Sequence, residues 1–438
     1  MLGCSYGNIF QVSVAGGSYQ EGLTVHIQGV EPGLLFDESS IYTDLLVRKP
    51  GQGELTSPRR EPDIPVIYSG VNAANTMPGF KNAEHTNGTP LVILIPNLDR
   101  HFEHIEQYQV TNRTPRPGHA SYASYQKYGS WDDAIGAGIF SGRYTSTIVA
   151  AGAVAKKVLE KFGIRVFGYV KEAAGVKLQK NIPYAEIERK THAYRNMRRD
   201  HDPIYRYVYG EDRIRPGMRF LEKMAVLSEV EKIIPDIQRA KMDIEAIRAQ
   251  GLHPQLNCPD LETADAMYEE ILRITNEEGD SSGGIVEIVA QGLPAGVGEP
   301  VFRKLDGEIG RMMSIGTIKG VEIGSGFEAA RMTGSKNNDQ LHMEKGKVAF
   351  SGNNAGGITG GLSTGQDIVV RLAVKPTPTI AKPQQTIDKV DLKDAAMAAV
   401  TRRDPTIVSR VWPVGEAFLA IILADMMMNY VAAKGKLQ

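Results

Sequence analysis

The sequence has few cysteines, no long apolar run and almost no net charge. Each of these features argues against one class of protein. Its two cysteines, Cys4 and Cys258, lie far apart, which argues against a disulfide framework or a cysteine metal site and favours a reducing cytoplasm. No apolar run reaches the roughly 20 residues that cross a bilayer, so no membrane segment is expected. The formal net charge of -1 argues against a nucleic-acid-binding protein. We expect no metal site.

Glycine, by contrast, is abundant and unevenly placed. The chain has 46 glycines, and they cluster at 129–142, 279–298, 316–326 and 352–365. Such clusters mark places where the backbone turns tightly or comes close to a ligand. The chain of 438 residues is long enough for a large buried core, and its length alone would allow two or three domains.

Apolar periodicity predicts helices and strands that are interleaved without the regular cadence of a doubly wound sheet. Helical spacing occurs at 146–162 and 261–276, and 413–431 is apolar on every side, which predicts a buried helix. A charged stretch, 184–251, is predicted to form a helical arm that lies on the body, with a helix at 220–250 that Pro235 kinks or divides. Two strands joined by a turn at Gly16 and Gly17 are expected within 8–30, further strands at 91–96, 164–170, 284–290 and 368–374, and a glycine turn at 320–327.

The densest chemistry lies at residues 114–122, where a cationic cluster, two prolines and a histidine share nine positions. Arg113 and Arg116 offer planar guanidinium groups for a carboxylate or phosphate. His119 has an ordinary pKa of about 6.5, close to working pH. The pattern suits an anionic substrate that needs a proton moved, although a basic surface loop would look the same locally.

Weaker motifs offer further binding groups. Residues 334–339, which include Asn338 and Asp339, carry groups for the polar edge of a heterocycle, and Lys375 with Thr377 and Thr379 suits a phosphate tail. Arg143 lies at the start of a helix, where free amides favour anions. Ordinary turns and surface ion pairs remain the alternative for each of these motifs.

The glycines of 356–361 resemble a dinucleotide-binding pattern only superficially. They do not lie between a strand and a helix with an acidic residue about 20 positions later. A glycine-lined turn is therefore predicted there, and not a Rossmann site.

Taken in order along the chain, these segments resemble the chorismate synthase family. The similarity covers most of the sequence. It rests on YGNIF at 6–10, RKPGQ at 48–52, RREPD at 59–63, RPGH at 116–119, FSGR at 140–143, GDSSGG at 279–284, GEPVF at 298–302, MSIGTIKGVEIG at 313–324, NNAGG at 353–357, KPT at 375–377 and residues 413–425.

The resemblance implies one large α+β domain, a layered β-α-β sandwich over 1–438, with a helical insertion at about 180–252 that varies within the family. It also implies a homotetramer that binds reduced FMN and removes phosphate and a ring proton from 5-enolpyruvylshikimate 3-phosphate, a cyclic anionic acid, in a 1,4-anti elimination. No net redox change accompanies this reaction. The resemblance places His119, Asp404 and Tyr19 in catalysis, Arg48, Arg116, Arg143 and Arg402 at substrate or cofactor anions, and Ser141, Gly142, Asn338, Asp339, Lys375, Thr377 and Thr379 at FMN.

Several positions depart from the family pattern. Tyr19 stands where a histidine is expected beside the departing phosphate, and tyrosine, with a pKa of about 10, is a poor base at neutral pH. Another histidine is lost before Asp404, where Arg403 stands. Basic residues are replaced at Val47, Glu54 and Ile139.

These departures leave three hypotheses. The first is an FMN-dependent lyase of the family that has diverged to eliminate from, or rearrange, a related cyclic acid. The second is an authentic chorismate synthase in which Tyr19 and Arg403 cover the missing histidines. The third is a non-catalytic flavin-binding or assembly protein. The losses of charge favour the first.

Overall fold

The fold is built on two five-stranded antiparallel sheets. A computed structural model describes residues 2–59, 61–98, 113–133, 135–215, 217–234, 242–400 and 403–434. The first sheet has the order β1-β2-β3-β5-β4 and the second the order β7-β6-β8-β14-β9. The strands of the first are β1 (Ser5–Tyr6), β2 (Gln11–Gly16), β3 (Gly22–Gln28), β5 (Leu91–Pro96) and β4 (Val66–Ser69); those of the second are β7 (Val176–Lys177), β6 (Arg165–Ala173), β8 (Gly284–Gln291), β14 (Ile368–Val374) and β9 (Ile318–Ile323).

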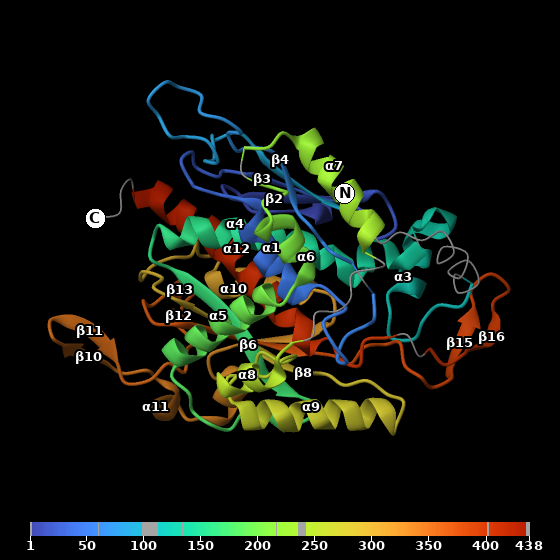
Figure 1. Ribbon diagram of the computed structural model, residues 1–438. Coiled ribbons are helices and arrows are strands. Elements are labelled where there is room, and N and C mark those ends of the chain that lie inside the picture. Colours follow the sequence, from blue (N-terminus) through green and yellow to red (C-terminus); the bar gives the residue numbers. More distant parts are fainter. Residues whose placement is uncertain are drawn as a thin grey trace.

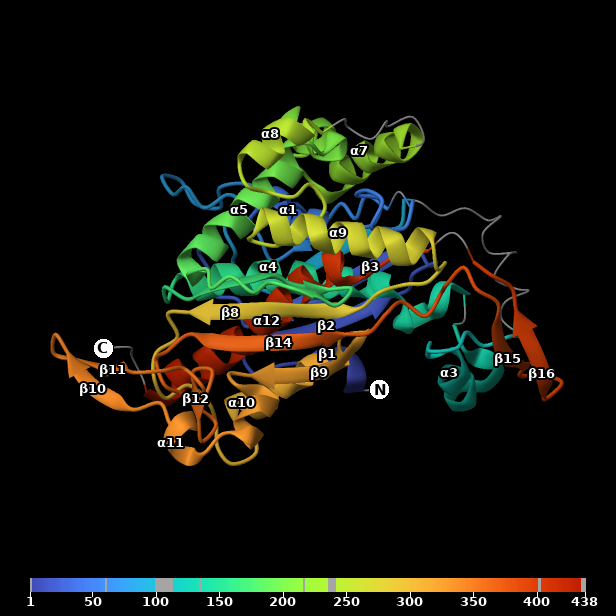
Figure 2. The ribbon, with the colours of Figure 1, turned by 90° about the horizontal axis from the view of Figure 1, so that it is seen from below.

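A helical layer lies between the two sheets. Helix α4 (Thr145–Glu160) contacts β3 and β5 of the first sheet, and α12 (Val408–Lys434) contacts β6 and β8 of the second. The two helices pack closely because Gly152 has no side chain; a Cβ at this position would collide with Ala417. Figure 2 shows this layer edge-on, with α12 beside the strands of the second sheet. The arrangement confirms the predicted layered β-α-β fold.

Helix α12 was predicted to be buried from its apolar composition, and it is. It is long and apolar enough to cross a membrane, but 94% of its most apolar window is enclosed by the body of the protein. The charged residues near the middle of the helix bind other groups inside the protein. Asp425, for example, accepts hydrogen bonds from the backbone N–H groups of Asn8, Ile9 and Phe10.

A group of helices between 184 and 252, hereafter the helical arm, lies on the body beside α1 (Glu38–Arg48). Apolar residues of α7, among them Leu227 and Val230, form a small core with Tyr42 and Leu46 of α1. The arm thus packs its own core against the body, as Figure 1 shows. That it is an insertion within the family stays a prediction. The arm consists of α5 (Tyr184–Asp200), α6 (Pro203–Tyr205), a π-helical turn η5 (Arg206–Gly210), α7 (Phe220–Ile233) and α8 (Ile244–Ala249).

Three hairpins and several short helices complete the described chain. The glycines of 356–361 form the turns around the small hairpin β12–β13, which agrees with the predicted glycine turn. The hairpins are β10 (Leu341–Glu344) with β11 (Lys347–Phe350), β12 (Ile358–Thr359) with β13 (Leu362–Ser363), and β15 (Gln384–Asp388) with β16 (Lys393–Met397). The helices are α3 (Ser121–Tyr128), α9 (Leu261–Asn276), α10 (Leu305–Gly310), α11 (Gly334–Asn337) and the 3-10 turns η1 (Leu2–Cys4), η2 (Gly129–Trp131), η3 (Ile135–Phe140), η4 (Gly142–Tyr144), η6 (Arg311–Ser314) and η7 (Gly326–Arg331).

Most predicted elements are confirmed, and two differ. The stretch predicted as a glycine turn begins inside β9, because Val321 pairs with Leu372 of β14. The helix predicted for 220–250 is two helices, α7 and α8, and α8 starts anew at Asp243, whose side chain accepts a hydrogen bond from the N–H of Ala246. Pro235 lies outside the described residues.

Candidate functional site

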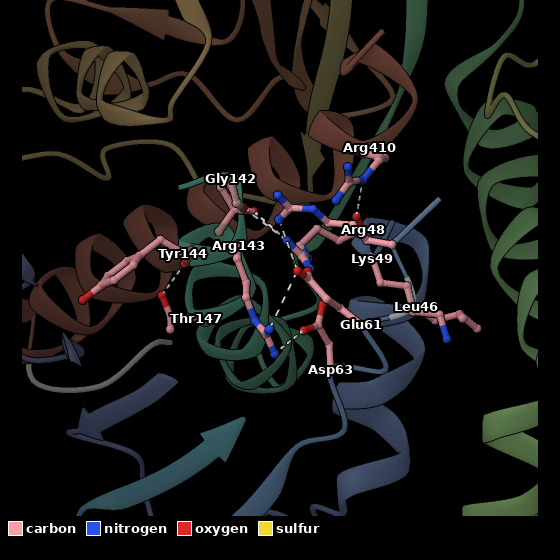
Figure 3. Close-up of polar contacts among 12 residues, drawn as sticks. Leu46, Arg48, Lys49, Glu61, Asp63, Gly142, Arg143, Tyr144, Thr147 and Arg410 are labelled. Atoms are coloured by element: carbon pink, nitrogen blue, oxygen red, sulfur yellow. Dashed lines mark hydrogen bonds and ion pairs between the residues drawn. The ribbon is translucent and has the colours of Figure 1, made fainter. Parts of the chain in front are cut away.

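The site begins with a buried group of charges where α1 ends and α4 begins. Arg48, the last residue of α1, forms an ion pair with Asp63 and donates to the carbonyl oxygen of Gly142 at 3.2 Å. Arg143, in the turn before α4, lies 3.5 Å from Asp63 Oδ1 and 3.8 Å from Glu61 Oε1. Figure 3 shows both guanidinium groups turned toward these two carboxylates. Two predicted anion-binding arginines therefore meet in one place.

This group, hereafter the arginine cluster, holds more positive than negative charge. In the described part of the chain it contains the guanidinium groups of Arg48, Arg59, Arg143 and Arg410 and the carboxylates of Glu61, Asp63 and Asp404. Burial alone would raise the pKa of Glu61, but the surrounding guanidinium groups, Arg143 first, hold that pKa below its ordinary value. The Nε atoms of Arg48 and Arg143 are buried without a hydrogen-bond partner. An anion fits such a cluster.

Asp404 joins the arginine cluster to the loop after β14. Its Oδ1 accepts hydrogen bonds from the N–H of Ser57 at 2.8 Å and from Arg410 at 2.9 Å. Its backbone oxygen accepts one from Thr377 Oγ1 at 2.9 Å. Arg410 also donates from Nε to the carbonyl oxygen of Arg48. Asp404, Thr377 and Arg48 are therefore held in one hydrogen-bonded network.

The second part of the site is the histidine loop, residues 115–119, which lies against Lys375. The ammonium group of Lys375 donates to the carbonyl oxygen of Gly118, and Arg116 Nη2 lies 3.4 Å from His119 Nε2. Burial, together with the positive charges of Arg116 and Lys375, lowers the pKa of His119 to about 4. His119 is therefore neutral at pH 7, and its imidazole is poised to gain charge when an anion approaches.

Arg113 does not take part in this site, although the motif suggested that it grips a ligand. Its guanidinium group lies 2.8 Å from both Asp388 and Asp391 of the β15–β16 hairpin. Two carboxylates of the hairpin therefore hold the charge of Arg113 in this structure, and a ligand-binding role for Arg113 stays a prediction. The contact fixes the start of the histidine loop to the hairpin.

Tyr19 lies in the turn between β2 and β3, next to Ser18. Ser141 Oγ donates to Ser18 Oγ at 3.1 Å, and the amide of Asn97 donates to the carbonyl oxygen of Ser18. Asn97 in turn accepts a hydrogen bond from Arg143 at 2.5 Å. The turn that carries Tyr19 is thereby tied to the arginine cluster.

Asn338 and Asp339 lie far from the other predicted FMN residues of the same chain. Asp339 accepts hydrogen bonds from the N–H groups of Asn354 and Ala355, next to the residues that precede β14. Lys375 follows β14, whose seven residues span roughly 20 Å. Figures 1 and 2 both place α11 and α3 at opposite ends of the molecule.

The remaining predicted residues divide between the site and its surroundings. Thr379 is half-buried in the loop that carries Lys375 and Thr377. Arg403 donates to the carbonyl oxygens of Val400, Thr275 and Asp280, so it fixes the end of α9. Arg402 lies outside the described residues.

Sequence reasoning passed over four residues of the network. Asn97 and Arg410 carried no motif signal beyond being single polar residues beside a strand and an apolar helix. Glu61 and Asp63 belong to a motif that supports the family resemblance but were given no role. Their partners became visible only with the tertiary structure.

The chain is similar to known proteins over almost its whole length. The model of the family described as chorismate synthase matches residues 10–428. The chain belongs to the chorismate synthase family. It is 38% identical to the chorismate synthase of Acetivibrio thermocellus, covering 97% of this chain and 94% of that protein, and 37% identical to that of Methanosarcina acetivorans, covering 98% and 97%. A crystal structure of chorismate synthase matches with a TM-score of 0.63 at 26% identity over 97% of this chain and 94% of that one.

Membership gives the general class of activity. Chorismate synthases are carbon–oxygen lyases that eliminate phosphate from a cyclic anionic substrate, and they use reduced FMN. The arginine cluster and the histidine loop both carry guanidinium groups, which suit an anionic substrate and the phosphate of FMN.

Proposed function

We propose that this protein is an authentic chorismate synthase. It converts 5-enolpyruvylshikimate 3-phosphate to chorismate by breaking one ring C–H bond and the C–O bond to phosphate, with formation of a ring double bond. The observation that carries the proposal is the arginine cluster joined to Asp404 and the histidine loop, in a chain whose full-length relatives are named chorismate synthases.

The residues present fit FMN as the cofactor. Arg116, His119 and Lys375 lie close together, and burial and neighbouring Lys319 lower the pKa of Lys375. An anion placed there relieves this crowding of positive charge. Lys375, Thr377 and Thr379 would hold the phosphate of FMN, and Ser141 and Gly142 would line the same site. Bound reduced FMN supplies transient electron donation to the substrate, with no net redox change.

The chain's own residues bind the substrate and move protons. Arg48 and Arg143 bind its anionic groups from within the arginine cluster, and Arg116 does so from the histidine loop. His119, neutral until an anion binds, exchanges a proton at its imidazole. Asp404 is oriented by Ser57 and Arg410 for the second acid–base position.

Tyr19 donates a hydrogen bond to the departing phosphate. Its turn is held next to Ser141 by the bond between Ser18 and Ser141. A phenol suffices for this role because donating a hydrogen bond requires no change of charge.

The hypothesis of a diverged substrate is less well supported by the site. Val47 is 1% exposed and packs in the hydrophobic core, and Glu54 bonds to Tyr268 of α9. Neither replacement removes a charge from the arginine cluster. Arg403, which was expected to cover a missing histidine, is occupied by carbonyl groups. Val47 and Glu54 therefore give no support for a changed substrate, and the full-length relatives are named chorismate synthases, so the second hypothesis is preferred.

A homotetramer is part of the proposal. For Asn338 and Asp339 to reach the flavin held by Lys375, they must come from another copy of the chain, because they lie at the opposite end of this one. The β10–β11 hairpin next to them projects from the body, and Leu341 and Met343 on it are exposed. A second copy that covers these side chains would complete the FMN site. We place this assembly in the cytoplasm.

The test is direct. Purified protein with anaerobically reduced FMN and 5-enolpyruvylshikimate 3-phosphate is expected to release phosphate and form chorismate in equal amounts. Flavin binding without phosphate release would favour a diverged substrate. Failure to bind FMN at all would favour a non-catalytic protein. Growth rescue of a bacterium that lacks chorismate synthase checks the same activity in cells.

A further inference from the structure

The helical arm touches the segment that carries Arg48 at two points, and Gln255 just beyond the arm touches it at a third. At the first, Lys49 Nζ lies 2.5 Å from Asp202 Oδ2, and Lys49 also donates to the hydroxyl of Tyr42 at 2.8 Å. The hydroxyl of Tyr42 donates to Asp202 Oδ1. The side chains of Lys49 and Asp202 are 9% and 8% exposed, so this ion pair is desolvated and its geometry is fixed.

Lys49 directly follows Arg48 and is the residue at which the chain leaves α1. The two neighbouring side chains are held on different partners, Arg48 by Asp63 and Lys49 by Asp202. The carbonyl oxygen of Arg48 also accepts a hydrogen bond from Arg410. The backbone at Arg48 and Lys49 is therefore fixed by Arg410 of the body and by Asp202 of the arm.

The second and third contacts hold the loop that follows. Arg198 of α5 donates to the carbonyl oxygen of Gln52, and it reaches Pro254 at 3.1 Å. Gln255, just beyond the arm, accepts a hydrogen bond from the N–H of Leu55 at 3.1 Å. Gln52 itself caps the end of α1 by donating to the carbonyl oxygen of Lys49. The loop ends at Ser57, whose N–H binds Asp404.

We propose that the helical arm, together with Gln255 just beyond it, is a positioning element of the active site, in which Asp202, Arg198 and Gln255 hold residues 49–55 and so set the direction of Arg48. The inference rests on the proposed function, because it assigns the arm a share in substrate binding. Asp202 touches no reacting group. It acts through Lys49, and its loss moves Arg48 away from the geometry in which the substrate's anionic group is bound.

The chain offers a matched control for this idea. Glu38, at the other end of α1, forms an equally buried ion pair with Lys223 of α7 and accepts a hydrogen bond from the N–H of Ile67. Glu38→Gln and Asp202→Asn each remove one carboxylate from an ion pair between the arm and α1. They differ in their distance along α1 from Arg48.

The experiment compares the two variants in the full-length enzyme with reduced FMN. We expect both to lower the thermal unfolding midpoint. Only Asp202→Asn should raise KM for 5-enolpyruvylshikimate 3-phosphate, by about tenfold with kcat changed much less, because ground-state and transition-state binding are lost together. Asp202→Glu, which keeps the charge, should return KM toward the wild-type value. Equal KM values in Asp202→Asn and Glu38→Gln, whether raised or unchanged, would overturn the proposal.

Two further measurements keep the test decisive. If Asp202→Asn does not fold, Gln255→Met, at a half-buried position, should raise KM in the same way, and an unchanged KM would overturn the proposal. Amide hydrogen exchange of residues 50–57 needs no turnover. It should be faster in Asp202→Asn than in Glu38→Gln, and equal rates would overturn the positioning role. Wild-type protein that releases no phosphate would instead refute the proposed function and leave the exchange result to judge the arm.

Discussion

The arginine cluster and the histidine loop handle positive charge in opposite ways. In the cluster, Arg48 and Arg143 are almost fully buried, and carboxylates hold them in place. At the histidine loop, burial and then nearby positive charges lower the pKa of His119 and that of Lys375, which lies against the loop. The arginines of the cluster are therefore held in place by carboxylates of the chain before an anion binds. The positive groups at the histidine loop would instead be stabilised by the bound anion itself.

The largest effect is expected from removing a carboxylate inside the arginine cluster. Asp63→Asn leaves Arg48 and Arg143 without their shared buried anion, and breaking such a pair costs about 3–5 kcal/mol. Urea unfolding measures this loss of stability. As a control, Asp388→Asn removes a partner of the exposed Arg113 and should leave the midpoint near the wild-type value. A stable Asp63→Asn protein would show that the cluster is not preorganised by charge pairing.

The next largest effect is expected on the chemistry of the histidine loop. His119→Ala should lower kcat by at least about a hundredfold, the usual contribution of a general acid or base, and leave FMN binding intact. Single-turnover phosphate release measures the chemical step, and a flavin fluorescence titration measures FMN binding. His192→Ala is a control, because burial lowers the pKa of His192 as well and its side chain lies on the exposed face of α5. Unchanged turnover in His119→Ala would refute the role of His119.

A smaller effect concerns the pH at which His119 takes up a proton. Positive neighbours disfavour the imidazolium form, so Arg116→Gln should raise the pKa of His119 above its wild-type value of about 4. FMN, whose phosphate brings negative charge, should move the pKa in the same direction. An NMR titration of the imidazole C–H signals follows both shifts. If neither change moves the pKa upward, burial alone sets it, and the contrast with the arginine cluster weakens.

The smallest effect is expected at Tyr19, which neither part of the site controls by charge. Tyr19→Phe removes one hydrogen bond to the departing phosphate, and the loss of about 1 kcal/mol corresponds to roughly a fivefold fall in kcat/KM. Steady-state kinetics measure it, with Tyr122→Phe on the exposed face of α3 as the control. A fall of several hundredfold would mean that Tyr19 acts as an acid and not only as a donor.

Much of the fold could be read from the sequence because apolar periodicity is a local property. Strand β14 and helix α9 have the bounds that their spacing predicts. The bounds of β9 were misjudged because its glycine-rich sequence looks like a turn until Val321 pairs with β14. The break between α7 and α8 was likewise set by a cap at Asp243, which periodicity alone did not reveal.

The site was only partly predictable for a different reason. His119 stands out locally as a histidine beside arginines, whereas Lys375 is a weak local signal and the role of Asp404 was assigned only from the family resemblance. Arg113 looked equally suitable but is held by the β15–β16 hairpin, more than 250 positions away along the chain. Contacts over such sequence distances leave no local pattern.

By itself the sequence determined the layered α+β fold, the family and the types of charged group that bind an anion, because hydrophobic periodicity and side-chain chemistry are carried residue by residue. Only the tertiary structure decided which of those charged groups lie beside a group of opposite charge. It buried Arg48 against Asp63, left His119 beside two cations, and set the helical arm against Lys49. The physical reason is that the effect of a charge depends on its distance from other charges and from water, and folding alone fixes those distances.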